Sequence, residues 1–421
     1  MESSATGTQG VPGAQLPFAG PVATGSRIVA VDAVRGFALF GVLLENMYGF
    51  GADSIAWNSA ADRVAFAIMH VFFESKTWTL FSILFGLGFA LQLERADASG
   101  VRVLPTYLRR LALLFGLGAA HALLFDGDIL MLFAELGLGL LFVRRLPTRA
   151  LLLLAAGLVL VFPLARLSGP EEQQAGQYDI QEAREELEHA ARTDVYAIGS
   201  LAEVMADNAD AIPADPFEDR DNPESGLAVF AMFLVGYAIG RSGVLRDIPA
   251  NAAAIARVRA WGVGLGLGAM LAERVLHVTA GYDVFRVQQA GPGVRFVGDL
   301  LFAYGITALA LGYAAALVLV AQSPRGKSAL APLAVIGRLT LTAYLLQTLM
   351  FTTLFYGYGF GQVYRLGPVA VTGWAVAFFA AQLVAAQWWS RRFLLGPVEW
   401  LWRSATYLRW QPLRLRRPST P

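Results

Sequence analysis

The stretch Gly116–Phe142, GLGAAHALLFDGDILMLFAELGLGLLF, has the composition of two membrane spans joined by a short turn. Four titratable side chains interrupt it: His121, Asp126, Asp128 and Glu135. An ionised group in a bilayer costs about 3 kcal/mol or more unless it is paired or solvated. The stretch therefore predicts membrane helices whose polar groups have a structural or a chemical task.

The composition of the whole chain supports a membrane protein. The chain has 421 residues, of which 56% are hydrophobic and 15% charged, and its mean hydropathy is +0.51. These values exclude an ordinary soluble enzyme. The absence of cysteine excludes thiolate metal sites, disulfides and a cysteine nucleophile, and four histidines do not favour a histidine-rich metal site. We expect no metal and no nucleic-acid partner.

Apolar runs predict an all-α polytopic membrane protein with about ten transmembrane helices, because a span needs about 20 mostly apolar residues. One run is too long for a single span, so we expect an interfacial or re-entrant piece that ends near Glu74 and a span that starts near Thr77. The candidate segments are 27–50, 64–93, 104–125, 129–143, 150–167, 226–239, 260–277, 294–320, 333–356 and 368–393.

The distribution of arginine and lysine predicts the orientation. Every second connection is basic, which indicates an even number of spans with both termini in the cytoplasm and the chain in the cell (inner) membrane. The predicted organisation is a disordered cytoplasmic tail (1–26), N-terminal transmembrane helices (27–167), an acidic extracytoplasmic insertion (168–225), C-terminal transmembrane helices (226–410) and a basic cytoplasmic tail (411–421). We expect short helices in the insertion to cap the outer face.

Two arginines near the cytoplasmic side are candidates for an anion site. Asp32 and Arg35 share one helix face and can form an interfacial ion pair, or Arg35 can bind a phosphate at the cytoplasmic mouth. Arg338 starts a later span and could join Arg35, although snorkelling at a helix end explains it equally well.

Further polar residues lie within or between the first spans. Glu45 and Asn46 fall inside the first span, where Asn46 suits either helix packing or function. Lys76 would offer a cation to a ligand or neutralise Glu74, and His70 fits a packing histidine.

The opening stretch contains the candidate base. Asp128 precedes an apolar run and suits an N-cap. His121 lies near the outer end of its helix, where it is either structural or a general base. Glu135 is in the middle of a short span and must face protein or water.

Five motifs give a resemblance that runs from about residue 27 to 407. In order they are VDAVRG…EN, FFESKTWTLFSILFGLGFAL, HALLFDGDIL, GRLTLTAYLLQT and LLGPVEWLWRSATY. Together they resemble the YeiB-like family of bacterial membrane proteins, whose C-terminal half is a domain of unknown function. The chain departs from the family pattern at Ser75, where glycine is usual, and at Ala343, where asparagine is usual.

The first motif is also similar to heparan-glucosaminide N-acetyltransferases, which are transmembrane acyltransferases. The matching residues are Asp32, Arg35, Gly36, Asn46, Trp57 and Asn58. Trp57 also fits an interfacial anchor. Ser54 replaces the catalytic histidine of those enzymes. The resemblance implies an acyltransferase fold that takes acyl-CoA from the cytoplasm and an acceptor from outside.

We therefore expect a transmembrane acyltransferase that moves an acyl group, acetyl above all, from acyl-CoA to an extracytoplasmic hydroxyl or amine of a small molecule or an envelope glycan. His121 with Asp128 would deprotonate the acceptor, Arg35 with Arg338 or Lys76 would hold the donor phosphates, and Asn46 would support the thioester carbonyl. The alternative is a proton-coupled small-molecule transporter with a relay through Glu45, Glu135 and His121. A small-residue run, WGVGLGLGAM, could pack helices within one chain or in a homodimer.

Overall fold

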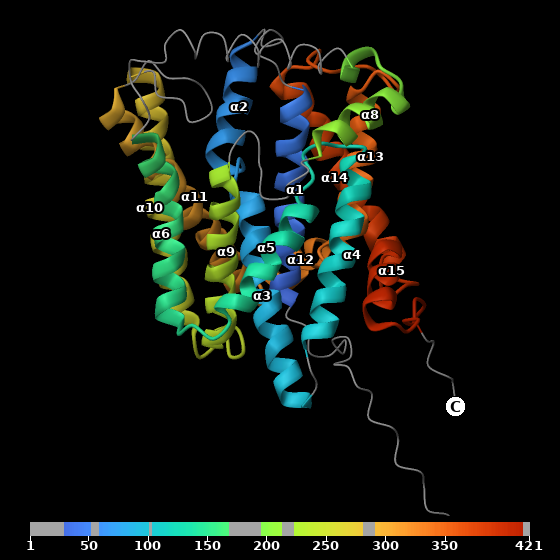
Figure 1. Cartoon of the computed structure of the whole chain (residues 1–421). Coiled ribbons are helices and arrows are strands. Elements are labelled where there is room, and N and C mark those ends of the chain that lie inside the picture. The colour runs from blue at the N-terminus through green and yellow to red at the C-terminus, as the bar shows by residue number, and fades with distance from the viewer. Residues whose placement is uncertain are drawn as a thin grey trace, which may run out of the picture.

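The computed structural model describes residues 29–51, 59–100, 103–167, 195–212, 223–280 and 291–415. These residues form an elongated bundle of helices that run mostly along its long axis (Figure 1). The helices of the first half are α1 Val29–Gly51, α2 Ala60–Phe72, α3 Lys76–Ser99, α4 Leu104–Ala122, α5 Leu130–Val143, α6 Thr148–Leu167 and α8 Leu201–Ala211. Those of the second half are α9 Pro223–Ser242, α10 Ala252–Ala280, α11 Pro292–Val320, α12 Pro324–Ile336, α13 Thr340–Phe355, α14 Pro368–Ser390 and α15 Pro397–Tyr407.

The all-helical prediction is confirmed for the described residues, whose only β-type pairing is an isolated bridge between Phe393 and Arg414. Within the same residues, five helical segments are long and apolar enough to cross a membrane, or six if α12 and α13 count as one span. Helix α1 carries three charged side chains and α5 has only 14 residues, so length and composition do not identify them as spans. The predicted tail 1–26 lies outside the described residues, as does 416–421 of the predicted tail 411–421. Residues 413–415 of that tail pair with the backbone at 392–394.

The long apolar run 64–93 is interrupted near Glu74, as the sequence predicts. Helix α2 ends at Phe72 and α3 begins at Lys76. Ser75 joins them with a φ of 61°, in the left-handed region that favours glycine. A glycine, which the resemblance leads us to expect at this position, would adopt this conformation without strain.

The segment 333–356, predicted as one continuous span, is instead broken. Helices α12 and α13 meet at an angle of 68° across Gly337–Leu339. The break lies where the chain packs against α1: a Cβ atom on Gly337 would be 1.9 Å from the carbonyl oxygen of Asp32. The helix bends at this close crossing, and a hydropathy pattern contains no signal for such a bend. Helix α15, downstream of the last predicted span, is a further element that the apolar runs do not indicate.

Part of the acidic insertion caps one end of the bundle, as predicted. Helix α8 starts with a reciprocal capping box between Ser200 and Glu203, in which the hydrogen bonds from Ser200 lower the pKa of the Glu203 carboxyl. Tyr196 donates to Asn208, and Asn208 donates to the carbonyl of Leu123 at the end of α4. The segment 195–212 is therefore fastened to the end of α4.

The crossing of α1 and α12 depends on two glycines, which gives a first testable prediction. A Cβ atom on Gly36 would lie 2.1 Å from the carbonyl oxygen of Leu333, a backbone atom that cannot move aside without shifting a helix. We expect Gly36→Ala to lower the free energy of unfolding by about 2 kcal/mol or more. Gly88→Ala is the control, because nothing lies within 4 Å of its added Cβ. Thermal unfolding in detergent measures both, and equal stability of the two variants would contradict the packing described here.

Candidate functional site

His121 is held between two polar side chains from other parts of the chain. It lies near the end of α4 with only 3% of its surface exposed. Its Nδ1 atom is 2.6 Å from Oδ2 of Asp128, and its Nε2 atom is 2.7 Å from Oγ1 of Thr348 on α13. These three residues form the His121 cluster.

Asp128 has two tasks, one for each carboxylate oxygen. Oδ2 contacts His121, while Oδ1 accepts the backbone N–H of Met131 at 2.9 Å. The N-cap residue of α5 is Ile129, one position after the expected Asp128, but the Asp128 side chain still accepts a backbone N–H in the first turn of the helix. Close approach at this point needs Gly118, since a Cβ there would lie 2.7 Å from Asp128 Oδ1. The carboxylate that orients His121 is thus fixed by the fold.

Aromatic rings and the capping segment enclose the His121 cluster. The centroids of the Tyr344 and Phe125 rings lie 4.9 and 5.9 Å from that of His121. Phe125 in turn packs edge-on against Phe351 on α13. The hydroxyl of Tyr196, in the capping segment, also lies 3.2 Å from Oδ2 of Asp126 in the turn after α4. This environment excludes bulk water, which strengthens electrostatic interactions inside it.

The order of groups in the cluster is that of a hydroxyl, an imidazole and a carboxylate. An ionised carboxylate only accepts, so Nδ1 carries a hydrogen and Nε2 is left to accept from a hydroxyl. This tautomer is the one required of a general base, and the carboxylate stabilises the imidazolium that forms when the base takes a proton. The arrangement is therefore that of a histidine base oriented by a carboxylate, with a hydroxyl at its free nitrogen.

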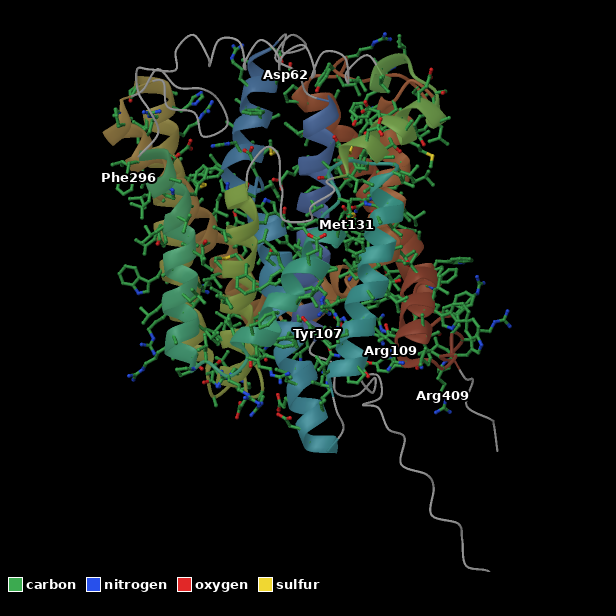
Figure 2. All side chains as sticks on the ribbon, viewed as in Figure 1. Asp62, Tyr107, Arg109, Met131, Phe296 and Arg409 are labelled. Carbon is green, nitrogen blue, oxygen red and sulfur yellow. The ribbon has the colours of Figure 1, made fainter. Side chains whose placement is uncertain are left out.

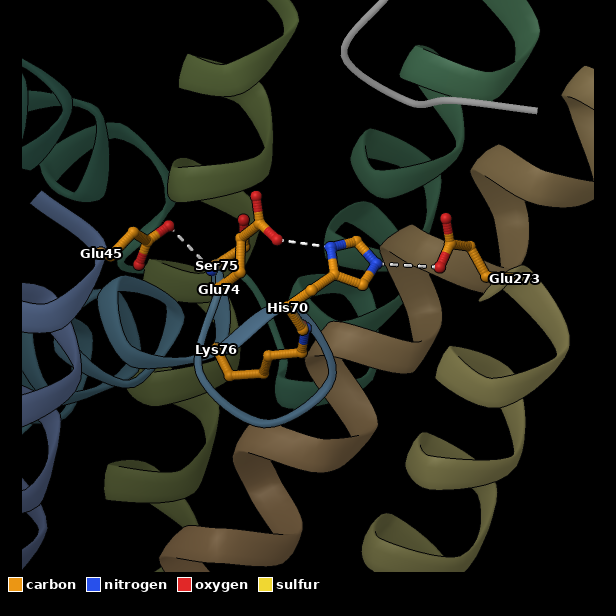
Figure 3. Close-up of polar contacts among 6 residues, drawn as sticks. All are labelled: Glu45, His70, Glu74, Ser75, Lys76 and Glu273. Carbon is orange, nitrogen blue, oxygen red and sulfur yellow. Dashed lines mark hydrogen bonds and ion pairs between the residues drawn. The ribbon is translucent and has the colours of Figure 1, made fainter. Parts of the chain in front are cut away.

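A second histidine lies in a separate set of charged residues at the break between α2 and α3 (Figure 3). Nδ1 of His70 is 2.5 Å from Oε2 of Glu74, and Nε2 is 3.0 Å from Oε2 of Glu273 on α10. Lys76 is 0% exposed and donates to the backbone carbonyl of His70 at 2.6 Å. Glu45 on α1 accepts the Ser75 N–H at 2.9 Å. Glu45, His70, Glu74, Lys76 and Glu273 are called the His70 cluster below.

This geometry changes the interpretation of three residues. Lys76, expected at the donor phosphates or beside Glu74, donates to the His70 carbonyl and interacts electrostatically with the carboxylates of the cluster, so we assign it to the His70 cluster. Glu74, expected as a supporting residue, binds His70 directly. His70, taken from the sequence as a packing residue, pairs with two carboxylates.

The basic connections gather at one end of the bundle, as their alternation along the chain predicts. The ends of α3, α5 and α9 and the start of α4 surround a cavity of about 850 Å³. Its charged lining residues are Glu94, Asp97, Arg144, Arg145, Arg241 and Arg246. Arg246 pairs with Glu94 at 2.8 Å, and the lining keeps an excess of positive charge. We call this cavity the arginine pocket.

A group of arginines adjoins the same end of α3. Arg35 and Arg95 are close enough to Arg110 to act on it electrostatically. The guanidinium of Arg110 lies 4.8 Å from the centre of the Trp402 ring, and its Nε atom is buried without a hydrogen-bond partner among the described residues. Arg95 is two residues from Asp97 of the arginine pocket. The arrangement leaves a buried donor that an anion could satisfy.

The remaining predicted residues are placed as follows. Asp32 and Arg35 form the expected ion pair at 2.9 Å. Arg338 directly follows Gly337, the residue packed against Asp32, so the chain brings the two predicted anion-binding segments together. Asn46 is partly exposed on α1, next to Glu45, and Glu135 is partly buried on α5. Trp57, Asn58 and Ser54 lie outside the described residues.

Sequence reasoning missed Thr348 and Glu273. Both contact a histidine that is far away in the chain, at separations of 227 and 203 residues. Thr348 is the last residue of the motif GRLTLTAYLLQT, and nothing in the motif indicates a role for it. Glu273 lies near the end of a predicted helix, where a charged residue is common. The spacing of His70 and Glu74, four residues apart on a helical pattern, is the one local signal that could have revealed their pairing.

Comparison with known proteins assigns the chain to a family. Residues 239–409 match the model of a protein of unknown function, DUF418. The chain is 31% identical to the uncharacterized protein YxaH of Bacillus subtilis (strain 168), over 93% of this chain and 97% of that protein. It is also 31% identical to the uncharacterized protein YeiB of Escherichia coli (strain K12), over 90% of this chain and 96% of that one. No solved structure matches. The chain therefore belongs to the YeiB-like family of proteins that carry the DUF418 domain.

Proposed function

We propose that the chain is a membrane-bound acyltransferase that moves an acyl group, acetyl above all, from cytoplasmic acyl-CoA to a hydroxyl or amine on the other side. The observation that carries this proposal is His121, held by Asp128 on one ring nitrogen and by the Thr348 hydroxyl on the other. A base with an orienting carboxylate and a hydroxyl at its free nitrogen is the arrangement that activates a nucleophile.

In the proposed reaction the acceptor replaces the Thr348 hydroxyl at Nε2 of His121. Thr348 can leave because its hydroxyl also lies 3.4 Å from the Tyr344 carbonyl, an acceptor in its own helix. His121 then takes the proton of the acceptor while the acceptor oxygen or nitrogen bonds to the thioester carbon. The carbon–sulfur bond breaks, and the thiolate leaves with the proton returned by the imidazolium. Asp128 stays ionised throughout and stabilises the charged ring.

The arginine pocket and the adjoining arginines are the proposed site for the phosphates of the donor. A cavity of about 850 Å³ is large enough for part of a cofactor-sized ligand. Guanidinium groups match phosphate geometry and remain charged. In Figure 2, Arg109, which precedes Arg110 on α4, lies lower in the bundle than Met131, whose backbone N–H donates to Asp128. Eleven residues of α4 separate Arg110 from His121, which is about 16 Å along a helix. The donor would therefore extend its acyl arm along α4.

The proposed setting is the cell (inner) membrane, crossed about ten times with both termini in the cytoplasm. Three basic connections meet at the arginine pocket, and the capping segment 195–212 lies at the other end of α4. This separation supports an arginine-rich cytoplasmic end and an acidic outer end. Helices α1, α5 and α9 pack against the long apolar helices α3, α6, α11 and α14, and α4 packs against α5 and α15.

Removal of the base gives the most direct test of the residues. We expect His121→Gln to lower the rate of coenzyme A release from acetyl-CoA by about 10² to 10⁴-fold, because proton transfer by the base is lost. The assay uses vesicles with glucosamine as the probe acceptor and a thiol reagent as the readout. His277→Gln is the matched control, since His277 lies outside the His121 cluster. Unchanged release in His121→Gln would remove this histidine from the mechanism.

Donor binding gives a test that is independent of the acceptor. We expect acetyl-CoA to stabilise the purified protein by about 2.7 kcal/mol at about 100 times its Kd, and 3′-dephospho-CoA to bind more weakly. Arg145→Gln should weaken binding, because Arg145 lines the arginine pocket, whereas Arg149→Gln, at the start of α6 and outside the pocket lining, provides the control. Thermal shift measures the wild type and both variants with each of the two ligands. No stabilisation at millimolar acetyl-CoA would contradict the proposed donor.

A further inference from the structure

The geometry of the His70 cluster fixes how many protons its central part holds. Both ring nitrogens of His70 lie within hydrogen-bond distance of a carboxylate oxygen, one from Glu74 and one from Glu273. Two oxygens or an oxygen and a bare nitrogen repel each other unless a hydrogen lies between them, so each contact contains one proton. Glu74, His70 and Glu273 therefore share two protons and have a net charge of −1. This sum does not depend on which partner in each contact holds the proton.

Lys76 compensates this charge. Its ammonium group is fully buried and interacts electrostatically with Glu74, Glu45 and Glu273. A protonated Lys76 brings the sum for Glu74, His70, Glu273 and Lys76 to zero. Burial strongly favours a neutral total, because an uncompensated charge in a low-dielectric interior costs several kcal/mol.

Glu45 remains as the one member of the cluster without a compensating charge. The groups that act on it are Glu74, Lys76, the Ser75 N–H and the Thr77 hydroxyl. Ser75 donates at 2.9 Å and Thr77 lies at 3.5 Å. A hydroxyl can donate to an ionised carboxylate or accept from a protonated one, so this surrounding accommodates both forms. From α11 the neighbour of the cluster is the Phe302 ring, 6.0 Å from the ammonium of Lys76, and from α10 it is Glu273.

We propose that the His70 cluster is a proton-exchange site inside the membrane-crossing bundle, in which Glu45 takes up and releases one proton. The uptake makes the cluster neutral, and the release leaves one buried negative charge that strengthens the hydrogen bond from Ser75. Glu45 and Glu74 are partly exposed, whereas His70, Lys76 and Glu273 are buried. Because Glu74 is engaged by His70, Glu45 is the partly exposed member that does not share a proton with the histidine. The site lies on α1, α2, α3, α10 and the turn between α2 and α3, while the His121 cluster lies on α4, α13 and the turn between α4 and α5. The inference therefore does not depend on the acyltransferase proposal.

The backbone at the break between α2 and α3 links the charge of Glu45 to the fold. The Ser75 N–H reaches Glu45 from a residue in the left-handed region, which is strained for a non-glycine residue. An ionised Glu45 holds this turn by a charge-assisted hydrogen bond, and a protonated one holds it less strongly. Proton exchange would thus alter the strength of the joint between α2 and α3.

Difference infrared spectroscopy of the full chain in lipid vesicles tests the proposal. The probe is the proton alone, and the sodium-free buffer is stepped between about pH 5 and about pH 9. Exposed carboxyl groups titrate near about pH 4 and stay mostly ionised over this range. We expect the carbonyl band of one protonated carboxyl group per chain at low pH, and its loss at high pH. The band should be absent in Glu45→Gln, which keeps the acceptor for Ser75, and unchanged in Glu203→Gln, whose carboxyl group is on the exposed helix α8.

A second variant covers the case in which Glu45→Gln fails to fold. Glu45→Asp keeps the carboxyl group but shortens its reach, so its band should persist at a shifted frequency and a shifted midpoint. The proposal is overturned if the wild type has no titrating carboxyl band, or if the band remains unchanged in both Glu45 variants. It is also overturned if sodium chloride, but not choline chloride, removes the band at constant pH, because sodium would then be the ligand.

Discussion

Every buried ionisable group in an apolar helical bundle must find a partner, and this constraint determines how these helices come together. In a bilayer there is no water to solvate such groups, so each unpaired one costs several kcal/mol. His121 ties the end of α4 to the start of α5 and to α13. His70 ties α2 and the turn after it to α10. Two histidines thereby connect helices that apolar packing alone would leave free to rotate or slide.

The two clusters differ in what they can do. The His121 cluster is closed by aromatic rings and ends in a hydroxyl, which suits the activation of an oxygen or nitrogen nucleophile. The His70 cluster has three carboxylates and two bases, which suits the storage of protons. A protein that contains both would carry out group transfer at one place and respond to protons at another. Helix α1 connects the two clusters. It carries Glu45 of the His70 cluster, and it packs against α12, the helix before α13, which carries Thr348 of the His121 cluster.

Much of the fold can be predicted from the sequence, because apolar runs of sufficient length specify helices. The break before Lys76 and the pairing of His121 with Asp128 could also be predicted, since both depend on residues close together in the chain. The bend between α12 and α13 could not, because it arises where Gly337 meets the backbone of Asp32. Thr348 and Glu273 could not be assigned for the same reason: a hydropathy pattern fixes a helix but not the face it turns to a partner 200 residues away. The resemblance to acyltransferases adds a predicted reaction, acyl transfer. The relatives YxaH and YeiB are uncharacterized, so they do not test this reaction.

The most direct test of the central claim is the structure of the protein with a non-hydrolysable acyl-CoA analogue, determined by electron microscopy in lipid nanodiscs. The account predicts phosphate density at the arginine pocket or the adjoining Arg110, and an acyl carbonyl about 3 to 4 Å from Nε2 of His121, with the Thr348 hydroxyl turned away. An analogue bound with its acyl group remote from His121, while His121 keeps its bond to Thr348, would contradict it.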